Sequence, residues 1–222
     1  AVISLGTALP ADCTPFAAFP VAEDAGVIAY TLTDAPNLVL TPQNVQDIFS
    51  GKVTNWSDPS IAASNPDATL PSLPISVVGT PQQSEIDALA AWFKKVGVAF
   101  TPTLAKVTAV DSGAALANLA EGQLAITSFS NALYAYSTVA AIQVGKDLAT
   151  ADVSGVQLGA DKAAAKPKAG DPIGYGATYP VTLSLCGAEN ATLRAFGRFV
   201  IRQDSQRSEE HTSELQSPCT IS

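Results

Sequence analysis

Apolar residues recur with a helical period soon after residue 40. Val45, Ile48 and Phe49 stand at positions i, i+3 and i+4, which places them on one face of a helix. Thr41 is a suitable N-cap, and Gly51 can adopt the left-handed conformation that ends a helix. The pattern therefore predicts a short amphipathic helix over residues 42–50, and the Pro, Asn and Asp residues beyond it predict turns as far as residue 71.

A buried strand and a longer helix are predicted next. Residues 75–78 (ISVV) are a short apolar run between Pro74 and Gly79, which is typical of a strand inside a sheet. Thr80 and Gln83 have the spacing of a capping box, so the helix is expected to begin directly after Thr80. Its predicted buried face consists of Ile86, Leu89, Ala90 and Phe93.

The rest of the chain alternates between strand and helix patterns. Further strands are predicted at residues 27–33, 107–110, 124–129, 140–144 and 181–185. Helices are predicted at residues 114–120 and 189–203, the second with Leu193, Phe196, Val200 and Ile201 directed inward, and residues 149–172 are expected to form a surface excursion with a short helix. Because strands alternate with helices, we expect an α/β fold with a mostly parallel sheet covered on both faces.

The last sixteen residues have an unusual pattern. The stretch RSEEHTSELQS, residues 207–217, matches one reading frame of a common sequencing-library adapter. We therefore expect residues 207–222 to be a non-native tail, the alternative being a polar disordered tail. The chain also starts without Met and contains none, so we expect its front to be clipped as well.

Without that tail the chemistry available to the chain is narrow. Lys and Arg fall from 12 to 11 and Asp and Glu from 20 to 17, so the net charge becomes −6 instead of −8. His211, the single histidine, and Cys219 both belong to the tail. The remaining chain cannot form a histidine-dependent triad or a histidine metal site. A pI near 4.5 also argues against nucleic acid and anionic membrane surfaces as partners.

The remaining 206 or so residues suffice for one large domain or two small lobes. No apolar run approaches the length of about 20 residues that spans a membrane. The sparse charge suits a protein exported from the cytoplasm. Cys13 and Cys186 can form a disulfide, which would fit an oxidising compartment, or remain two buried thiols, and the sequence leaves both readings open.

One long run carries a family resemblance. LTPQNVQDIFSGKVTNWSDPSIAASNPDATLPSLPISVV resembles the solute-binding proteins of phosphate-type ABC transporters, in which L-x-x-IF-GK-x-NW-DP-I-NP-LP-I-VV is a signature. Weaker similarity follows in chain order in FPVAEDAGVIAYTL, VDSGAALANLAEGQLAITSFSNALYAYS, YPVTLSL and ATLRAFGRFV. Together these segments cover most of residues 19–206.

The resemblance implies a periplasmic-binding-protein fold of type 2. In this fold two α/β lobes are joined by crossing strands, ligand binds in the cleft, and the lobes close by hinge motion. On this reading residues 34–177 are lobe 2, and residues 1–33 and 178–206 are remnants of an incomplete lobe 1. The two segments expected to cross between the lobes are residues 27–33 and 181–185.

The predicted ligand residues differ from the family pattern. After the ISVV strand the family has R-x-D-G-S-G-T, whereas residues 79–85 read GTPQQSE, and no Arg precedes Arg194. A bidentate guanidinium clamp on an anion is therefore not available in the predicted lobe 2. The candidate ligand-binding residues are Thr80, Gln82, Gln83, Ser84, Ser112 and Gly113, although Thr80, Gln83 and Ser112 also fit helix caps.

The sequence thus predicts an extracytoplasmic solute-binding domain. It is expected to be no enzyme and to need no cofactor or metal. Its partners would be a small anionic or polar solute, with phosphate as one candidate, and the membrane permease of an ABC importer. The alternative is a cell-surface or adhesion module that keeps the scaffold and has lost transport.

Overall fold

The computed structural model describes residues 2–6, 9, 11, 13–103, 108–111, 116, 118–164 and 173–201. The chain divides into two compact units, unit 1 (Ala1–Asp24 with Pro180–Ser222) and unit 2 (Ala25–Tyr179). These boundaries differ from the predicted limits at 33/34 and 177/178, and the assignment of the units to lobes stays a prediction. The predicted tail, residues 207–222, lies outside the described residues, and so do residues 114, 115 and 117 of the helix predicted at residues 114–120.

Unit 2 contains a mixed sheet. Its strand order is β2 (Pro15–Tyr30), β6 (Gln123–Ser128), β4 (Ser76–Thr80) and β5 (Thr108–Asp111), and only the second half of β2 belongs to this unit. β6, β4 and β5 run parallel to one another, whereas β2 is antiparallel to β6 and to β7 (Thr138–Val139). The predicted parallel sheet therefore has an antiparallel strand at one side.

A second, smaller sheet completes unit 2. β8 (Ala141–Val144) pairs in parallel with β3 (Val39–Leu40) and antiparallel with β9 (Asp147–Ala149). The turn between β8 and β9 contains Gly145 at φ +63°, a backbone conformation that glycine adopts without steric cost.

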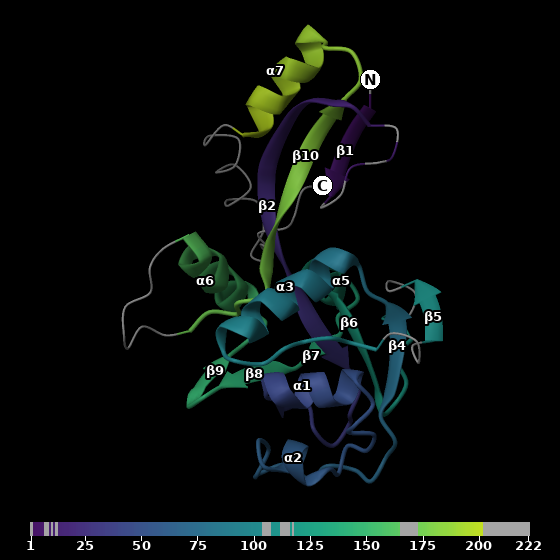
Figure 1. The fold of residues 1–222 in the computed structure, drawn as a ribbon. Coiled ribbons are helices and arrows are strands. Elements are labelled where there is room, and N and C mark those ends of the chain that lie inside the picture. The colour runs from purple at the N-terminus through teal and green to yellow at the C-terminus, as the bar shows by residue number, and fades with distance from the viewer. Residues whose placement is uncertain are drawn as a thin grey trace. The chain divides into compact units, whose positions relative to one another are not determined.

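Five helices of unit 2 lie in the described residues. They are α1 (Pro42–Phe49), α2 (Pro59–Ala62), α3 (Gln83–Lys95), α5 (Phe129–Tyr134) and α6 (Val153–Ala164). α3 packs on β6, and α1 packs on β3 and β8 (Figure 1).

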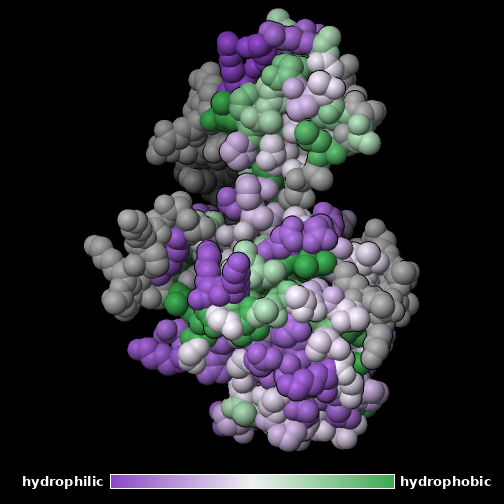
Figure 2. Space-filling view, in the orientation of Figure 1, coloured by the Kyte–Doolittle hydropathy of each residue, from purple (hydrophilic) through white to green (hydrophobic). Residues whose placement is uncertain are grey.

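Hydrophilic side chains cover much of the visible face, with small hydrophobic areas between them (Figure 2). Among the described residues, no helix combines the length and apolar character needed to cross a membrane.

α1 is built as the sequence predicts. The backbone N–H of Asn44 donates to Thr41 Oγ1 at 3.0 Å, and the backbone N–H of Thr41 donates to Asn44 Oδ1 at 3.0 Å. This reciprocal capping satisfies two donors at the start of the helix. Val45, Ile48 and Phe49 are all buried, so the predicted apolar face is confirmed.

The turn-rich run after α1 is held by side chains that reach distant backbone. Trp56 is fully buried, and its Nε1–H donates to the carbonyl of Gly122 at 2.9 Å. Asn65 accepts from the N–H of Val39 at 2.8 Å and donates to the carbonyl of the same residue at 2.7 Å. These bonds connect the loop to the starts of β6 and β3, which explains why a segment that consists mostly of turns, with the short α2 within it, has so specific a sequence.

The extended segment just before β10, residues 173–177, passes very close to α6. Cβ atoms added to Gly159 and Gly174 would lie 1.9 Å from the carbonyl oxygen of Tyr175 and 2.1 Å from the nitrogen of Gly159, respectively, so glycine is required at both positions. The ring of Tyr175 packs on Trp92 of α3 with centroids 4.9 Å apart. Complete burial raises the pKa of the Tyr175 phenol, which keeps this side chain neutral.

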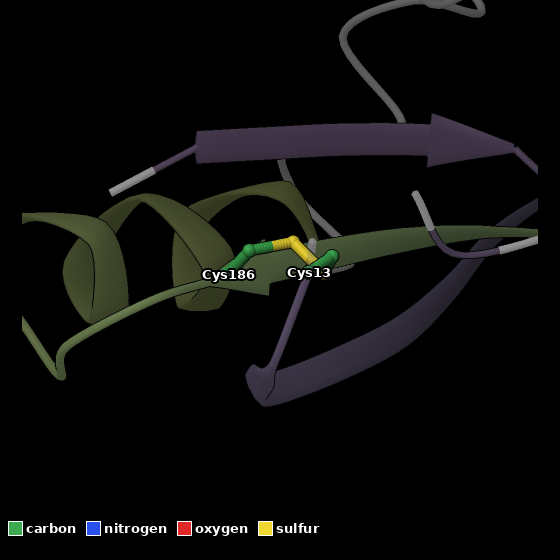
Figure 3. Close-up of a disulfide and its surroundings, with 2 residues drawn as sticks. All are labelled: Cys13 and Cys186. Carbon is green, nitrogen blue, oxygen red and sulfur yellow. A yellow bond between two sulfur atoms is a disulfide. The ribbon is translucent and has the colours of Figure 1, made fainter. Parts of the chain in front are cut away.

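In its described residues, unit 1 contains a three-stranded sheet with one helix. β10 (Thr178–Cys186) lies between β1 (Val2–Gly6), which is antiparallel to it, and the first half of β2. Cys13 and Cys186 are joined by a disulfide with a Cα–Cα distance of 5.1 Å (Figure 3). The chain passes between the units twice, within β2 after Asp24 and within β10 after Tyr179.

The inward face predicted for the last helix is only partly covered. In α7 (Ala191–Val200) the buried residue is Gly197, where an added Cβ would lie 2.8 Å from the ring of Phe19. Phe196 and Ile201 are 41% and 42% exposed, so the prediction that they point into a core is wrong. The three-stranded sheet is narrow, and α7 contacts it at a glycine. The sheet therefore covers less of the helix than the apolar face that the sequence predicts.

α5 ends in a Schellman motif with an unusual residue in it. The N–H of Ser137 donates to the carbonyl of Ala132 at 2.9 Å, and the N–H of Tyr136 donates to that of Leu133 at 3.1 Å. Tyr136 has a φ of +52°, in the left-handed position where glycine is favoured. Its side chain is 95% exposed, so it gains no packing energy in return.

We expect Tyr136→Gly to stabilise the protein by about 1 kcal/mol, because glycine adopts this conformation without the steric cost that a Cβ brings. Tyr134→Gly is the matched control, since Tyr134 is also exposed but lies within α5. There glycine should lower stability by about 0.5 kcal/mol. Urea unfolding followed by circular dichroism measures both changes, and a loss of stability in Tyr136→Gly would contradict the argument.

The disulfide should contribute strongly to stability, because it joins residues 173 positions apart and restricts the unfolded chain. We expect the double variant Cys13→Ser, Cys186→Ser to lose about 2 to 5 kcal/mol in the same assay. Dithiothreitol should lower the melting temperature of the unaltered chain and leave that of the double variant unchanged. Equal melting temperatures with and without reductant in the unaltered chain would contradict this prediction.

Candidate functional site

The carboxyl ends of three parallel strands meet at one edge of the unit 2 sheet. β4 ends at Thr80, which pairs with Asp111 at the end of β5, and β6, on the other side of β4, ends at Ser128. α3 and α5 begin just beyond β4 and β6. Ligands of α/β sheets bind at the carboxyl ends of strands, so this edge, which we call the β4–β6 edge, is the candidate site.

Four of the predicted ligand residues lie together at this edge. Thr80 is the last residue of β4, Gln82 is the N-cap of α3, and Gln83 and Ser84 form its first turn. Thr80, Gln82 and Gln83 are exposed, and Ser84 is half-buried. The edge therefore presents hydroxyl and amide groups, which are neutral donors and acceptors of hydrogen bonds.

The start of α3 differs from the prediction. The helix begins at Gln83 and not directly after Thr80, and the backbone N–H of Gln82 donates to Glu85 Oε2 at 2.8 Å. The predicted capping box of Thr80 and Gln83 is therefore wrong. Thr80 is still part of β4, where its pairing with Asp111 holds it extended.

Gln83 is turned along the helix. Its Nε2 donates to Asp87 Oδ1 at 2.8 Å, one turn further into α3. Such a pair stabilises the first turn but directs the amide away from the strand end. Of the four residues, Gln83 is thus the one whose amide is turned away from the strand end.

Glu85 is the most distinctive residue at the start of α3. It is 0% exposed, although it is a carboxylic acid. Its backbone lies against Gly26 of β2, where an added Cβ would stand 2.5 Å from the carbonyl oxygen of Glu85. A carboxylate near a helix N-terminus is stabilised by the helix dipole, and here it accepts one of the N–H groups that an anionic ligand would otherwise use.

Ser128 and Ser130 also belong to this edge, and sequence reasoning missed them. Ser128 caps α5 by accepting from the backbone N–H of Asn131 at 3.1 Å, and its Oγ lies 3.1 Å from that of Ser130. Ser128 also pairs with Gly26 across β2 and β6. A Ser followed three residues later by Asn at the end of an apolar run is the signal in the sequence, but the apolar run itself predicts only a strand over residues 124–129.

Ser112 and Gly113, the other two predicted ligand residues, lie outside the described residues. They follow directly after Asp111, the last residue of β5. Their assignment to the site stays a prediction.

Lysine supplies the positive side-chain charge of unit 2. Residues 25–179 contain lysine but no arginine. Lys52 is paired with Asp47 at 2.9 Å, and Lys94 and Lys95 lie at the opposite end of α3 from the β4–β6 edge. Within the described part of the chain, no group of His, Cys, Asp and Glu has the arrangement of a metal site. The edge can therefore hold a ligand by hydrogen bonds and not by ion pairs to arginine.

Comparison with known proteins identifies the fold. The family model of the PBP superfamily domain matches residues 9–204. No curated protein is significantly similar to the chain in sequence. Several solved structures match it with high probability, at low sequence identity.

Three of these structures illustrate the match. A protein from Clostridium perfringens, assigned as a phosphate ABC transporter substrate-binding protein and solved with bound phosphate, has a TM-score of 0.58 at 17% identity, covering 96% of this chain and 79% of its own. An ABC-type phosphate transport receptor from Vibrio cholerae has a TM-score of 0.50 at 14% identity, covering 92% of this chain and 75% of its own. A phosphate-binding protein from Stenotrophomonas maltophilia has a TM-score of 0.52 at 18% identity, covering 82% of this chain and 59% of its own. The predicted periplasmic-binding-protein fold is confirmed.

Proposed function

This chain belongs to the PBP superfamily, and from that premise we propose that it is a solute-binding domain that captures a small polar solute. The observation that carries the proposal is the β4–β6 edge, where neutral hydrogen-bonding groups gather at the ends of parallel strands. Capture requires only complementary hydrogen bonds and shape, so the proposed role involves no chemical change of the solute.

Phosphate is the first candidate ligand. Structures with the same fold include one solved with bound phosphate, and the hydroxyl groups of Thr80 and Ser84 can donate to phosphate oxygens. Two features weaken binding of an anion at this edge: the absence of arginine from residues 25–179, and the buried Glu85 carboxylate. We therefore propose that the site binds phosphate more weakly than an arginine clamp would.

The proposed role extends to a partner and a location. A solute-binding protein of an ABC importer works outside the cytoplasm and delivers its ligand to a membrane permease, and we propose the same for this chain. The disulfide between Cys13 and Cys186 supports the location, because such bonds persist in oxidising compartments.

Isothermal titration of the full chain with phosphate tests the proposal. We expect the double variant Thr80→Ala, Ser84→Ala to bind phosphate about 10- to 100-fold more weakly, since each lost hydrogen bond costs about 1 kcal/mol. Ser76→Ala is the matched control, because Ser76 is an exposed residue at the other end of β4, and its affinity should not change. No heat and no thermal shift with phosphate, arsenate or sulfate would exclude an oxyanion at this edge.

A second variant tests the electrostatic part of the proposal. Glu85→Gln removes the buried negative charge and keeps the side-chain shape, so we expect phosphate affinity to rise by about tenfold. Glu121→Gln is the control, since Glu121 accepts from Thr33 Oγ1 near the amino end of β6, away from the edge. An affinity that is the same in Glu85→Gln and in the unaltered chain would contradict the electrostatic argument.

A further inference from the structure

Unit 2 contains a groove that is separate from the β4–β6 edge. Its volume is about 320 Å³, and it lies between the segment that follows β2 and the segment that joins α5 to β7. Tyr30, which lines it, pairs with Leu124 near the amino end of β6, whereas Ser128 at the candidate solute edge is at the carboxyl end. The volume is in the range of small-ligand sites. We call this cavity the Tyr136 groove.

The walls of the Tyr136 groove combine hydroxyl groups with apolar side chains. Thr31, Ser137 and Thr138 supply the hydroxyl groups, whereas Thr33 Oγ1 already donates to Glu121 Oε2 at 2.8 Å. Leu116 and Leu119 are among the apolar residues. Among the described residues that line the groove, none carries a formal charge. A charged ligand would lose its hydration here without gaining an ion pair, so the lining favours an uncharged ligand that is rich in hydrogen-bonding groups.

The phenol of Tyr30 is not available to a ligand. Its hydroxyl donates to the carbonyl of Ala35 at 3.0 Å and accepts from the N–H of Leu38 at 2.9 Å. Burial raises the pKa of Tyr30, and the bond from Leu38 offsets part of that increase. Tyr30 is therefore a structural part of the groove, and Tyr136 is the exposed aromatic residue among the described lining.

Tyr136 occupies its position against its own conformational preference. The residue has a φ of +52° at the end of α5, where glycine would fit at lower cost, and its ring is 95% exposed. The side chain thus contributes neither to the core nor to the hydrogen bonds that end α5. A strained residue that is kept where it stabilises nothing is a reason to look for a function of its side chain.

We propose that the Tyr136 groove binds a neutral carbohydrate. The ring of Tyr136 would lie against the apolar C–H face of one sugar, and the threonine and serine hydroxyl groups would bond to sugar hydroxyl groups. A proline-rich peptide is the less suitable occupant, because such peptides dock between several aromatic ridges and the described lining exposes one ring. The proposal is independent of the solute bound at the β4–β6 edge.

Titration of the full chain with neutral hexasaccharides tests the proposal. The probes are the β-1,4-glucose, β-1,3-glucose, α-1,4-glucose, α-1,6-mannose and β-1,4-N-acetylglucosamine hexamers, each measured by calorimetry and by chemical-shift changes. At least one of them is expected to bind, and Tyr136→Gly should weaken that binding tenfold or more. The melting temperature of Tyr136→Gly should stay the same or rise, so that lost binding cannot be attributed to unfolding.

Two controls locate the binding. Tyr134→Ala removes an exposed ring, 89% accessible, that is not part of the groove lining, and this variant should keep its affinity. The Thr80→Ala, Ser84→Ala variant should also keep it, which separates the groove from the β4–β6 edge.

Three results would overturn the proposal. The first is no binding of any of the five hexasaccharides. The second is binding that survives in Tyr136→Gly or that is lost equally in Tyr134→Ala. The third is binding of a proline-rich decapeptide that depends on Tyr136 in the absence of sugar binding.

Discussion

The contact between Gly26 and the first turn of α3 is the constraint on which unit 2 depends. Two backbones meet there, since a Cβ on Gly26 would lie 2.5 Å from the carbonyl oxygen of Glu85. A similar contact involves the other half of the helix, where a Cβ on Gly176 would lie 2.5 Å from Trp92 Nε1. Because glycine permits both approaches, α3 is held against strand and loop along its length. That position directs Glu85 inward and leaves Thr80, Gln82 and Ser84 at the surface.

The sequence predicts best where local patterns and tertiary contacts agree. α1 has the predicted cap and buried face, and the run around Trp56 is as specific as expected, because Trp56 bonds to Gly122 and Asn65 bonds to Val39. These bonds join distant parts of the scaffold. This is why the family resemblance is strongest in a segment that stabilises the fold, even though the residues predicted to hold an anion differ.

Prediction failed where a distant part of the chain decides the local structure. Thr80 has the composition of a cap, but its pairing with Asp111 keeps it in β4, and Glu85 caps the helix instead. Phe196 follows the apolar period of α7, but helix and sheet meet at Gly197, so Phe196 stays partly exposed. Spacing along one segment cannot report either contact. The site was therefore predictable as an edge with polar residues, but the orientation of its side chains was not.

The two ends of β6 have different surroundings, and this difference bears on the two proposed sites. Ser128, at the carboxyl end of β6, pairs with Gly26, which packs against the start of α3 and the buried Glu85. Leu124, at the amino end, pairs with Tyr30 beside the uncharged Tyr136 groove. A charge acts over several ångströms in a low dielectric, whereas neutral hydroxyl groups act only on direct contact. Substitutions at one end are therefore expected to leave the other end unaffected, which is the condition for one small sheet to carry the two sites that we propose.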